Sequence, residues 1–109
     1  MEVALTRALL LHRGDSWTAD LEGTLRLRYS LRTMDYCRQH VTKECTGDVE
    51  LLVVDVSIDD PKMRAVLQMI RQVKSEFIEA VAIVCVSRVN RGPRFQHDIE
   101  LLGARFVYA

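Results

Sequence analysis

The chain of 109 residues contains little of what marks a specialised fold or site: three cysteines, two prolines and five glycines. Cys37, Cys45 and Cys85 form no CxxC pair and no Cys/His cluster with metal-ligand spacing. We therefore expect reduced thiols in a cytoplasmic protein, buried or half-buried as small apolar residues, and neither a disulfide framework nor a metal centre. The sequence also lacks a glycine-rich phosphate loop and the short motifs of zinc proteases and serine hydrolases.

The chain also has no net charge, because its fifteen basic side chains balance its fifteen acidic ones. A neutral chain has no general attraction for a polyanion, so we expect no nucleic-acid binding by this domain. The local exception is a loop with three arginines, Arg88, Arg91 and Arg94, which is the best candidate for an exposed contact cluster. The apolar N-terminal stretch is short and interrupted by charges, so it predicts neither a signal peptide nor membrane insertion.

The length and the lack of linker-like or repetitive segments indicate one domain over residues 1–109. Short apolar runs alternate with longer amphipathic stretches. The expected strands are residues 8–11, 29–35, 49–56, 80–86 and 105–109, and the expected helices are 15–28, 36–45, 61–77 and 95–102. The runs 49–56 and 80–86 are nearly continuous in aliphatic residues, which is typical of strands buried on both faces of a parallel sheet. The pattern predicts a doubly wound, five-stranded parallel α/β sheet of the flavodoxin-like kind.

Capping residues give the expected helix ends. Asp60 followed by Pro61 predicts the start of the third helix, because aspartate accepts a bond from a first-turn amide and proline needs no partner there. Asp15 or Ser16 is expected to cap the first helix, and Trp17 lies on the apolar stripe of that helix, where core packing is expected. Gly92–Pro93 is interpreted as a break ahead of the last helix.

Open parallel sheets bind ligands at the carboxyl ends of their strands, beside the point where the strand order reverses. That rule selects residues 12–15, 55–57 and 87–90, and the candidate site residues within them are His12, Arg13, Asp15, Asp55, Ser87 and Arg88. Asp55 stands out because it ends an otherwise apolar strand, and a buried carboxylate is costly unless it is paired or solvated. Two interpretations stay open at this point: a carboxylate that caps the following loop, and a functional group.

Three segments together resemble response-regulator receiver (CheY-like) domains. Residues 51–55 (LLVVD) resemble the third strand of that family, which ends in the phosphate-accepting aspartate. Ser87 closes the fourth strand where the family has a switch hydroxyl, and residues 101–107 (LLGARFV) are similar to its Gly-Ala turn into the fifth strand. The resemblance implies a phosphoacceptor position at Asp55.

The departures from the family pattern bear on function. Receivers hold Mg²⁺ with two acidic residues after the first strand, where this chain has His12 and Arg13. Mg²⁺ needs oxygen ligands, and Asp15 is in the wrong register to supply one. The family's lysine beyond the fifth strand would come next after Ala109, and its fifth helix is absent. Phosphoryl transfer depends on cations such as Mg²⁺ and this lysine, so little near Asp55 would stabilise the transition state. Arg13 or Arg88 is expected to form an ion pair with Asp55.

The missing helix also predicts exposed apolar groups near Phe106 and Tyr108, and therefore either a piece of a longer protein or a cover supplied by another subunit. The sequence thus predicts a non-catalytic receiver-like regulatory or protein-interaction module of a bacterial signalling or assembly protein, cytoplasmic and without Mg²⁺ or another cofactor. It would bind a protein partner or a second copy through the fourth helix and fifth strand, including Arg91 and Arg94, or through the strand-end rim. The alternatives are an Mg-dependent phosphoacceptor of a two-component system that uses Asp55, Asp15 and Ser87, and a small flavodoxin-like nucleotide or flavin binder.

Overall fold

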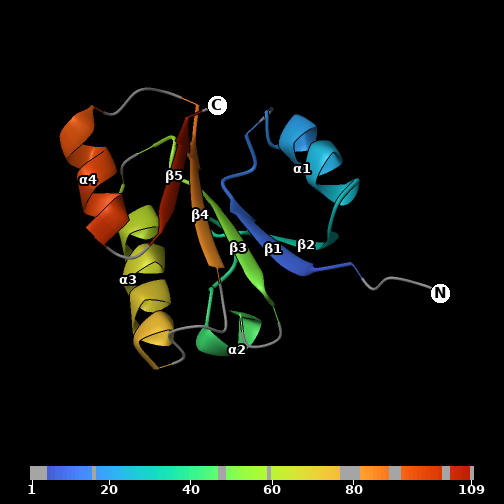
Figure 1. Cartoon of the computed structure of the whole chain (residues 1–109), viewed down its shortest axis with the longest axis horizontal. Coiled ribbons are helices and arrows are strands. Elements are labelled where there is room, and N and C mark those ends of the chain that lie inside the picture. Colours follow the sequence, from blue (N-terminus) through green and yellow to red (C-terminus); the bar gives the residue numbers. More distant parts are fainter. Residues whose placement is uncertain are drawn as a thin grey trace.

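The structure is a computed structural model that describes residues 5–15, 17–46, 49–58, 60–76, 82–88, 92–101 and 104–108. Five strands form one sheet in the order β2-β1-β3-β4-β5, and every neighbouring pair is parallel (Figure 1). The strands are β1 (Arg7–His12), β2 (Ser30–Asp35), β3 (Leu51–Asp55), β4 (Ala82–Ser87) and β5 (Arg105–Tyr108). The predicted doubly wound, five-stranded parallel sheet is confirmed.

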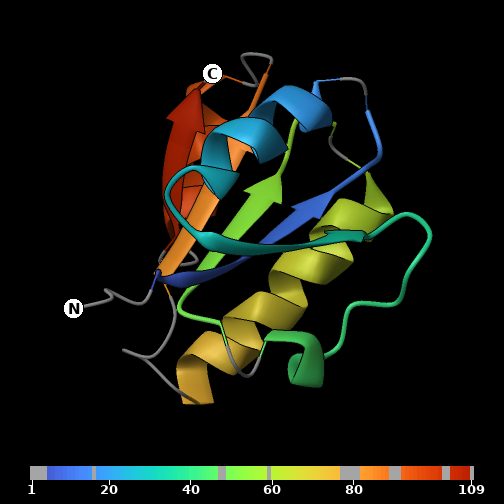
Figure 2. The same ribbon diagram turned by 90° about the vertical axis from the view of Figure 1, so that its right-hand side faces the viewer.

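The helices of the described residues lie on both faces of this sheet. They are α1 (Thr18–Arg26), α2 (Lys43–Thr46), α3 (Pro61–Glu76) and α4 (Pro93–Leu101). Figures 1 and 2 show α1 on one face and α3 on the other, and α2 and α4 share the side of α3. We call these sides the α1 face and the α3 face. No helix in the described ranges has the length and hydrophobicity that a bilayer span requires.

The near-continuous apolar runs are explained by burial on both faces. Successive strand residues point to opposite sides, so Leu52 and Val54 pack on the α3 face while Val53, between them, packs on the α1 face. The α3 face carries most of the core, including Leu9, Leu11, Met63, Val66, Leu67, Ile70, Ile83, Cys85 and Ile99. The α1 face has Leu10, Val53 and Val86 as its fully buried set, with Trp17, Leu21 and Leu25 half-buried against them. Core packing of Trp17 is thereby confirmed.

The start of α3 follows the prediction. The Met63 amide donates to Asp60 Oδ1 at 2.8 Å, and Pro61 is the first helical residue. The sequence also predicts continuation of the helix to Phe77, which lies outside the described residues.

The predicted helix over residues 36–45 is wrong, because only the single turn of α2 forms there. Asp35 directs the chain into a turn instead: its Oδ1 accepts the Cys37 amide at 2.9 Å and its backbone oxygen accepts the Gln39 amide at 2.8 Å. Tyr36 is buried, and its hydroxyl donates to the Asp55 backbone oxygen at 2.8 Å. These contacts hold residues 36–42 as a loop that runs beside α3.

Two predicted helix starts also need correction. Pro93 does not break the chain before α4 but begins the helix, as its fixed φ allows, and Gly92 precedes it with φ of 85°. The Asp15 side chain does not cap α1; Trp17 is the N-cap residue without a side-chain bond, and Asp15 contributes only its backbone oxygen, which accepts the Thr18 amide at 3.0 Å. Ser16, the other predicted cap, lies outside the described residues.

The edge strand β5 differs from expectation as well. Phe106, expected to be exposed, is half-buried on the α3 face and packs edge-on against Phe95 of α4, with ring centroids 6.2 Å apart. The exposed apolar residue of β5 is instead Val107, which has 39% of its surface accessible. The side chain of Tyr108 lies outside the described part of the structure.

Candidate functional site

The carboxyl ends of β1, β3 and β4 meet at one edge of the sheet, because the strands are parallel and adjacent. Leu11 pairs with Val54 and Asp55 pairs with Val86 in the strand register. The backbone continues this pairing beyond the strands, since the Val56 amide donates to the Val86 oxygen at 2.9 Å. The predicted site residues from three strand ends therefore come together at this edge.

Asp55 lies at the centre of the edge and is wholly buried, with 0% of its surface accessible. Its Oδ1 accepts the Ser57 amide at 2.9 Å, which is the loop-capping role that the sequence allowed. Its Oδ2 is buried and has no hydrogen-bond partner among the described residues. A buried carboxylate oxygen without a partner costs stability. The loop-capping interpretation is thus confirmed for Oδ1, and a functional role of Oδ2 stays a prediction.

Arg13 does not pair with Asp55, contrary to the prediction. Its guanidinium forms an ion pair with Asp60, the N-cap of α3, and stacks over the Tyr36 ring at 5.7 Å from the ring centroid. We call this ion pair, with the Tyr36 ring beneath it, the Arg13–Asp60 clasp. Asp60 is already ordered by the Met63 amide, so the arginine meets a fixed carboxylate rather than a mobile one. The clasp joins the loop after β1 to the start of α3.

The charges in the clasp follow from burial and pairing. Burial alone would raise the pKa of Asp60, but the Met63 amide and the Arg13 guanidinium stabilise the carboxylate, and the net effect lowers its pKa. Burial raises the pKa of Tyr36 above its ordinary value despite the nearby Arg13 cation. The Tyr36 hydroxyl therefore stays protonated and donates a hydrogen bond to the Asp55 backbone oxygen. Asp60 stays ionised opposite Arg13.

Arg88 also lacks the predicted pairing with Asp55. Its guanidinium lies over the Trp17 ring, 6.0 Å from the centroid, and its backbone amide donates to Ser57 Oγ at 2.9 Å. Ser87, at the switch-hydroxyl position, is completely buried at the end of β4. Of the predicted contact cluster, Arg88 and Arg94 are exposed and Arg91 lies outside the described residues. Their contact with a partner stays a prediction.

Asp35 is a site residue that the sequence reasoning missed. It ends β2 directly opposite His12 in the register, as Asp55 ends β3. Gly14 adopts φ of 78°, and a Cβ there would lie 2.9 Å from Asp35 Oδ2, so a larger residue would be strained and would have to displace this carboxylate. The Gly14 amide donates to His12 Nδ1 at 2.9 Å. An acidic residue at the end of a predicted strand, the signal used for Asp55, would have identified Asp35 too.

Several of the described carboxylate oxygens at this edge already have partners, whereas Mg²⁺ requires oxygen ligands in near-octahedral geometry. Asp55 offers one unpaired oxygen, whereas Asp60 is engaged by Arg13 and Asp35 by the Cys37 amide and by Arg38 at 3.7 Å. Within the described residues, no group of three or more histidine, cysteine, aspartate or glutamate side chains is placed to hold a metal ion.

The cysteines are free thiols. Cys85 is fully buried in β4, and burial raises the pKa of its thiol to about 12, which makes it an inert packing residue. Cys37 and Cys45 are half-buried, and the Thr42 hydroxyl beside Cys45 lowers the pKa of that thiol. The expectation of buried or half-buried thiols is confirmed.

Comparisons with known proteins relate the fold to a family. No protein-family model and no curated protein sequence matches the chain. Among solved structures, the chemotaxis protein CheY4 of Vibrio cholerae is 14% identical, with a TM-score of 0.71 over 97% of this chain and 86% of that one. A protein described as pilus assembly-related, from Burkholderia pseudomallei, is 12% identical, with a TM-score of 0.72 over 99% of this chain and 81% of that one. A signal receiver domain from Vibrio parahaemolyticus is 12% identical, with a TM-score of 0.65 over 95% of this chain and 78% of that one. This chain has the CheY-like fold of receiver domains, and Asp55 is buried at the end of its third strand, β3.

Proposed function

We propose that this chain is a receiver-like regulatory module that acts through protein contacts and without phosphoryl transfer to Asp55. The observation that carries the proposal is the Arg13–Asp60 clasp. A receiver that uses Mg²⁺ needs carboxylates free beside its phosphoacceptor, and here the guanidinium of Arg13, in the loop after β1, engages Asp60, the residue that caps α3.

The burial of Asp55 supports the same conclusion. Its carboxylate has no accessible surface, and its Oδ1 is held by the Ser57 amide. A phosphoryl donor has to approach a carboxylate oxygen in line, so attack at Oδ2 would require the surrounding loops to open first. Neither Arg13 nor Arg88 points its charge at Asp55, because one pairs with Asp60 and the other lies over Trp17. The cations that phosphoryl transfer requires are directed elsewhere.

The proposed partners are proteins: either a different protein or a second copy of this chain, in the bacterial cytoplasm. Two structural neighbours are described as a chemotaxis protein and as a pilus assembly-related protein, which is consistent with a signalling or assembly role. No catalytic group is assigned to the site. Sedimentation velocity across a range of concentrations separates the two partner types, since only self-binding changes the sedimentation coefficient with concentration.

The test uses beryllofluoride, which mimics an aspartyl phosphate, together with Mg²⁺. We expect the Val56, Ser57 and Arg88 amide signals in a ¹H–¹⁵N spectrum to stay in place. The matched variant His12→Asp/Arg13→Asp restores the acidic pair that the family uses, and we expect it to gain saturable shifts at these amides. Saturable shifts in the unmodified chain would instead establish the Mg-dependent phosphoacceptor, the second candidate. That candidate draws support from the unpaired Oδ2 of Asp55.

A further inference from the structure

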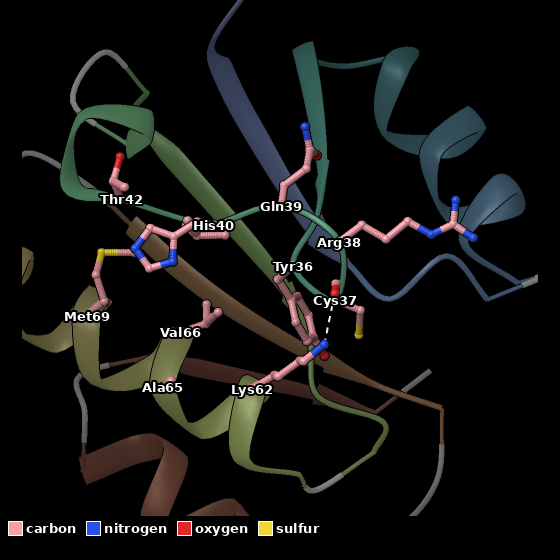
Figure 3. A pocket seen from close by; sticks show the side chains of 11 residues that line it. Tyr36, Cys37, Arg38, Gln39, His40, Thr42, Lys62, Ala65, Val66 and Met69 are labelled. Carbon is pink, nitrogen blue, oxygen red and sulfur yellow. Dashed lines mark hydrogen bonds between the residues drawn. The ribbon is translucent and has the colours of Figure 1, made fainter.

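We propose that a groove between the 36–42 loop and α3 is a docking site for a protein segment that combines apolar and acidic side chains. This inference rests on the proposed protein-interaction function and assigns it a surface and a partner chemistry. We call the site the loop–α3 groove (Figure 3).

Residues 36–42 form a loop and not the predicted helix, and this loop makes one wall of the groove. The loop runs past α3 and leaves a cavity of about 530 Å³, which is within the size range of binding clefts. Its walls are held in place by direct contacts. Lys62 Nζ of α3 donates to the Cys37 backbone oxygen at 2.9 Å, and buried Tyr36 anchors the start of the loop on β3 through Asp55. A binding surface with such fixed walls loses little conformational entropy when a partner is bound.

The floor of the groove is apolar. Val41 and Val66 lie at its base with 8% and 7% of their surfaces accessible, and half-buried Met69 and exposed Ala65 extend it along α3. Methionine is flexible and polarizable, and it is common at surfaces that accept apolar side chains of varied shape. The floor therefore fits one or two aliphatic or aromatic anchor residues of a partner.

The rim of the groove is basic. Arg38, His40 and Lys62 line it and are exposed, and none of the described lining residues is acidic. The sequence from Pro61 to Gln72 likewise holds basic residues and no acidic one. Because the whole chain is neutral, this is a local excess of positive charge, and it favours a partner with acidic residues beside its apolar anchors.

The surface is longer than a small molecule needs. A second hollow of about 480 Å³, lined by Asp60, Arg64 and Gln68 among others, adjoins the groove and shares Ala65 with it. Together the two hollows follow the solvent side of α3 over several turns. An extended, shallow, mixed surface of this kind suits a peptide segment, in which alternating side chains supply anchors and charges.

The experiment is a selection of random twelve-residue peptides on the immobilised full chain, after which the enriched peptides are tested for binding to the variant Ala65→Glu. Ala65 is exposed, so the change places a carboxylate in the groove without disturbing the core. We expect enriched peptides to combine leucine, methionine or phenylalanine with at least two acidic residues. We expect their binding to shift the amide signals of residues 36–42 and 62–69, and to weaken as salt screens the charges.

Charge reversal supplies the matched control. Arg38→Glu reverses an exposed charge on the rim and should weaken the binding of an enriched acidic peptide by about tenfold. Arg94→Glu reverses a charge on exposed α4 and should leave the affinity unchanged. Exchanging one acidic residue of the peptide for lysine should restore part of the binding to Arg38→Glu.

Three outcomes would overturn this inference: enriched peptides that are basic or neutral, peptides that still bind Ala65→Glu, and shifts confined to α4 and β5. The last result would leave the proposed protein-interaction function intact and move the surface to α4 and β5. The beryllofluoride experiment tests the phosphate-independent function by itself, so the two proposals fail separately.

Discussion

The two faces of the sheet are built very differently. On the α3 face, α2, α3 and α4 cover a continuous core that includes Leu52, Met63 and Ile70, each with 2% or less of its surface accessible. On the α1 face, α1 is the helix that the described residues provide, and Leu51 and Val84 remain half-buried. Free energy of burial scales with the apolar area removed from water, so the α3 face contributes most of the stability. The α1 face is where the sheet retains accessible apolar surface.

Adjacent leucines of β3 give the largest test of this difference. Leu52→Ala removes a side chain that is fully buried on the α3 face and should lower the free energy of unfolding by about 3 kcal/mol. Leu51→Ala, the neighbouring residue on the α1 face, should cost about 1 kcal/mol, because its side chain is only half-buried. Urea denaturation measures both values. Equal losses would mean that the α1 face is as well covered as the α3 face.

The Arg13–Asp60 clasp connects the two sides of the sheet, since it joins the loop leading to α1 with the first turn of α3. Arg13→Gln leaves Asp60 without its guanidinium and should destabilise the fold by about 2 kcal/mol in urea denaturation at pH 7. The pKa of Asp60 is lower in the folded chain than its ordinary value, so its contribution is present above the unfolded pKa and is lost as pH falls through the folded one. The difference between the wild type and Arg13→Gln should therefore shrink below about pH 4. A difference that stayed constant down to pH 2 would contradict the ionised pair.

Asp55 is the last β3 residue on the side of the sheet where Leu51 and Val53 pack, the α1 face. Its substitution gives the smallest expected change in the free energy of unfolding, and this change is a stabilisation. Asp55→Asn keeps the oxygen that accepts the Ser57 amide and replaces the unpaired buried Oδ2 by an uncharged group. A carboxylate oxygen without a partner costs more to bury than an amide, so this substitution should raise the free energy of unfolding by about 1 kcal/mol. Differential scanning calorimetry measures it, with Asp55→Ala as the control that also removes the cap. Destabilisation by the asparagine would mean that Oδ2 has a favourable partner.

The sequence predicts the parts of this molecule that are determined by local pattern and by burial on both sides. The segments of β3 and β4 are nearly continuous in aliphatic residues because each faces a helix layer on both sides of the sheet. The Asp60–Pro61 start of α3 is equally local, since the cap bond spans three residues. The position of Asp55 follows from the strand that it ends.

The remaining features depend on contacts between distant residues. Arg13 and Asp60 are 47 positions apart, and no spacing rule links them. The 36–42 loop has a weak helical pattern that is overridden by the bond from Tyr36 to the Asp55 backbone, 19 positions away. Phe106 was expected at an uncovered surface, whereas alternation along β5 places it under α4 against Phe95. In each case a tertiary contact decides between local alternatives of similar energy.

Gly14 links the carboxyl-end edge of the sheet to the proposed docking surface. The residue has φ of 78° and approaches Asp35 so closely that any Cβ would displace the aspartate side chain. Asp35 in turn holds the Cys37 and Gln39 amides, which start the 36–42 loop. A side chain at position 14 would therefore press on the aspartate that starts this loop, and a substitution there should also alter one wall of the proposed docking surface.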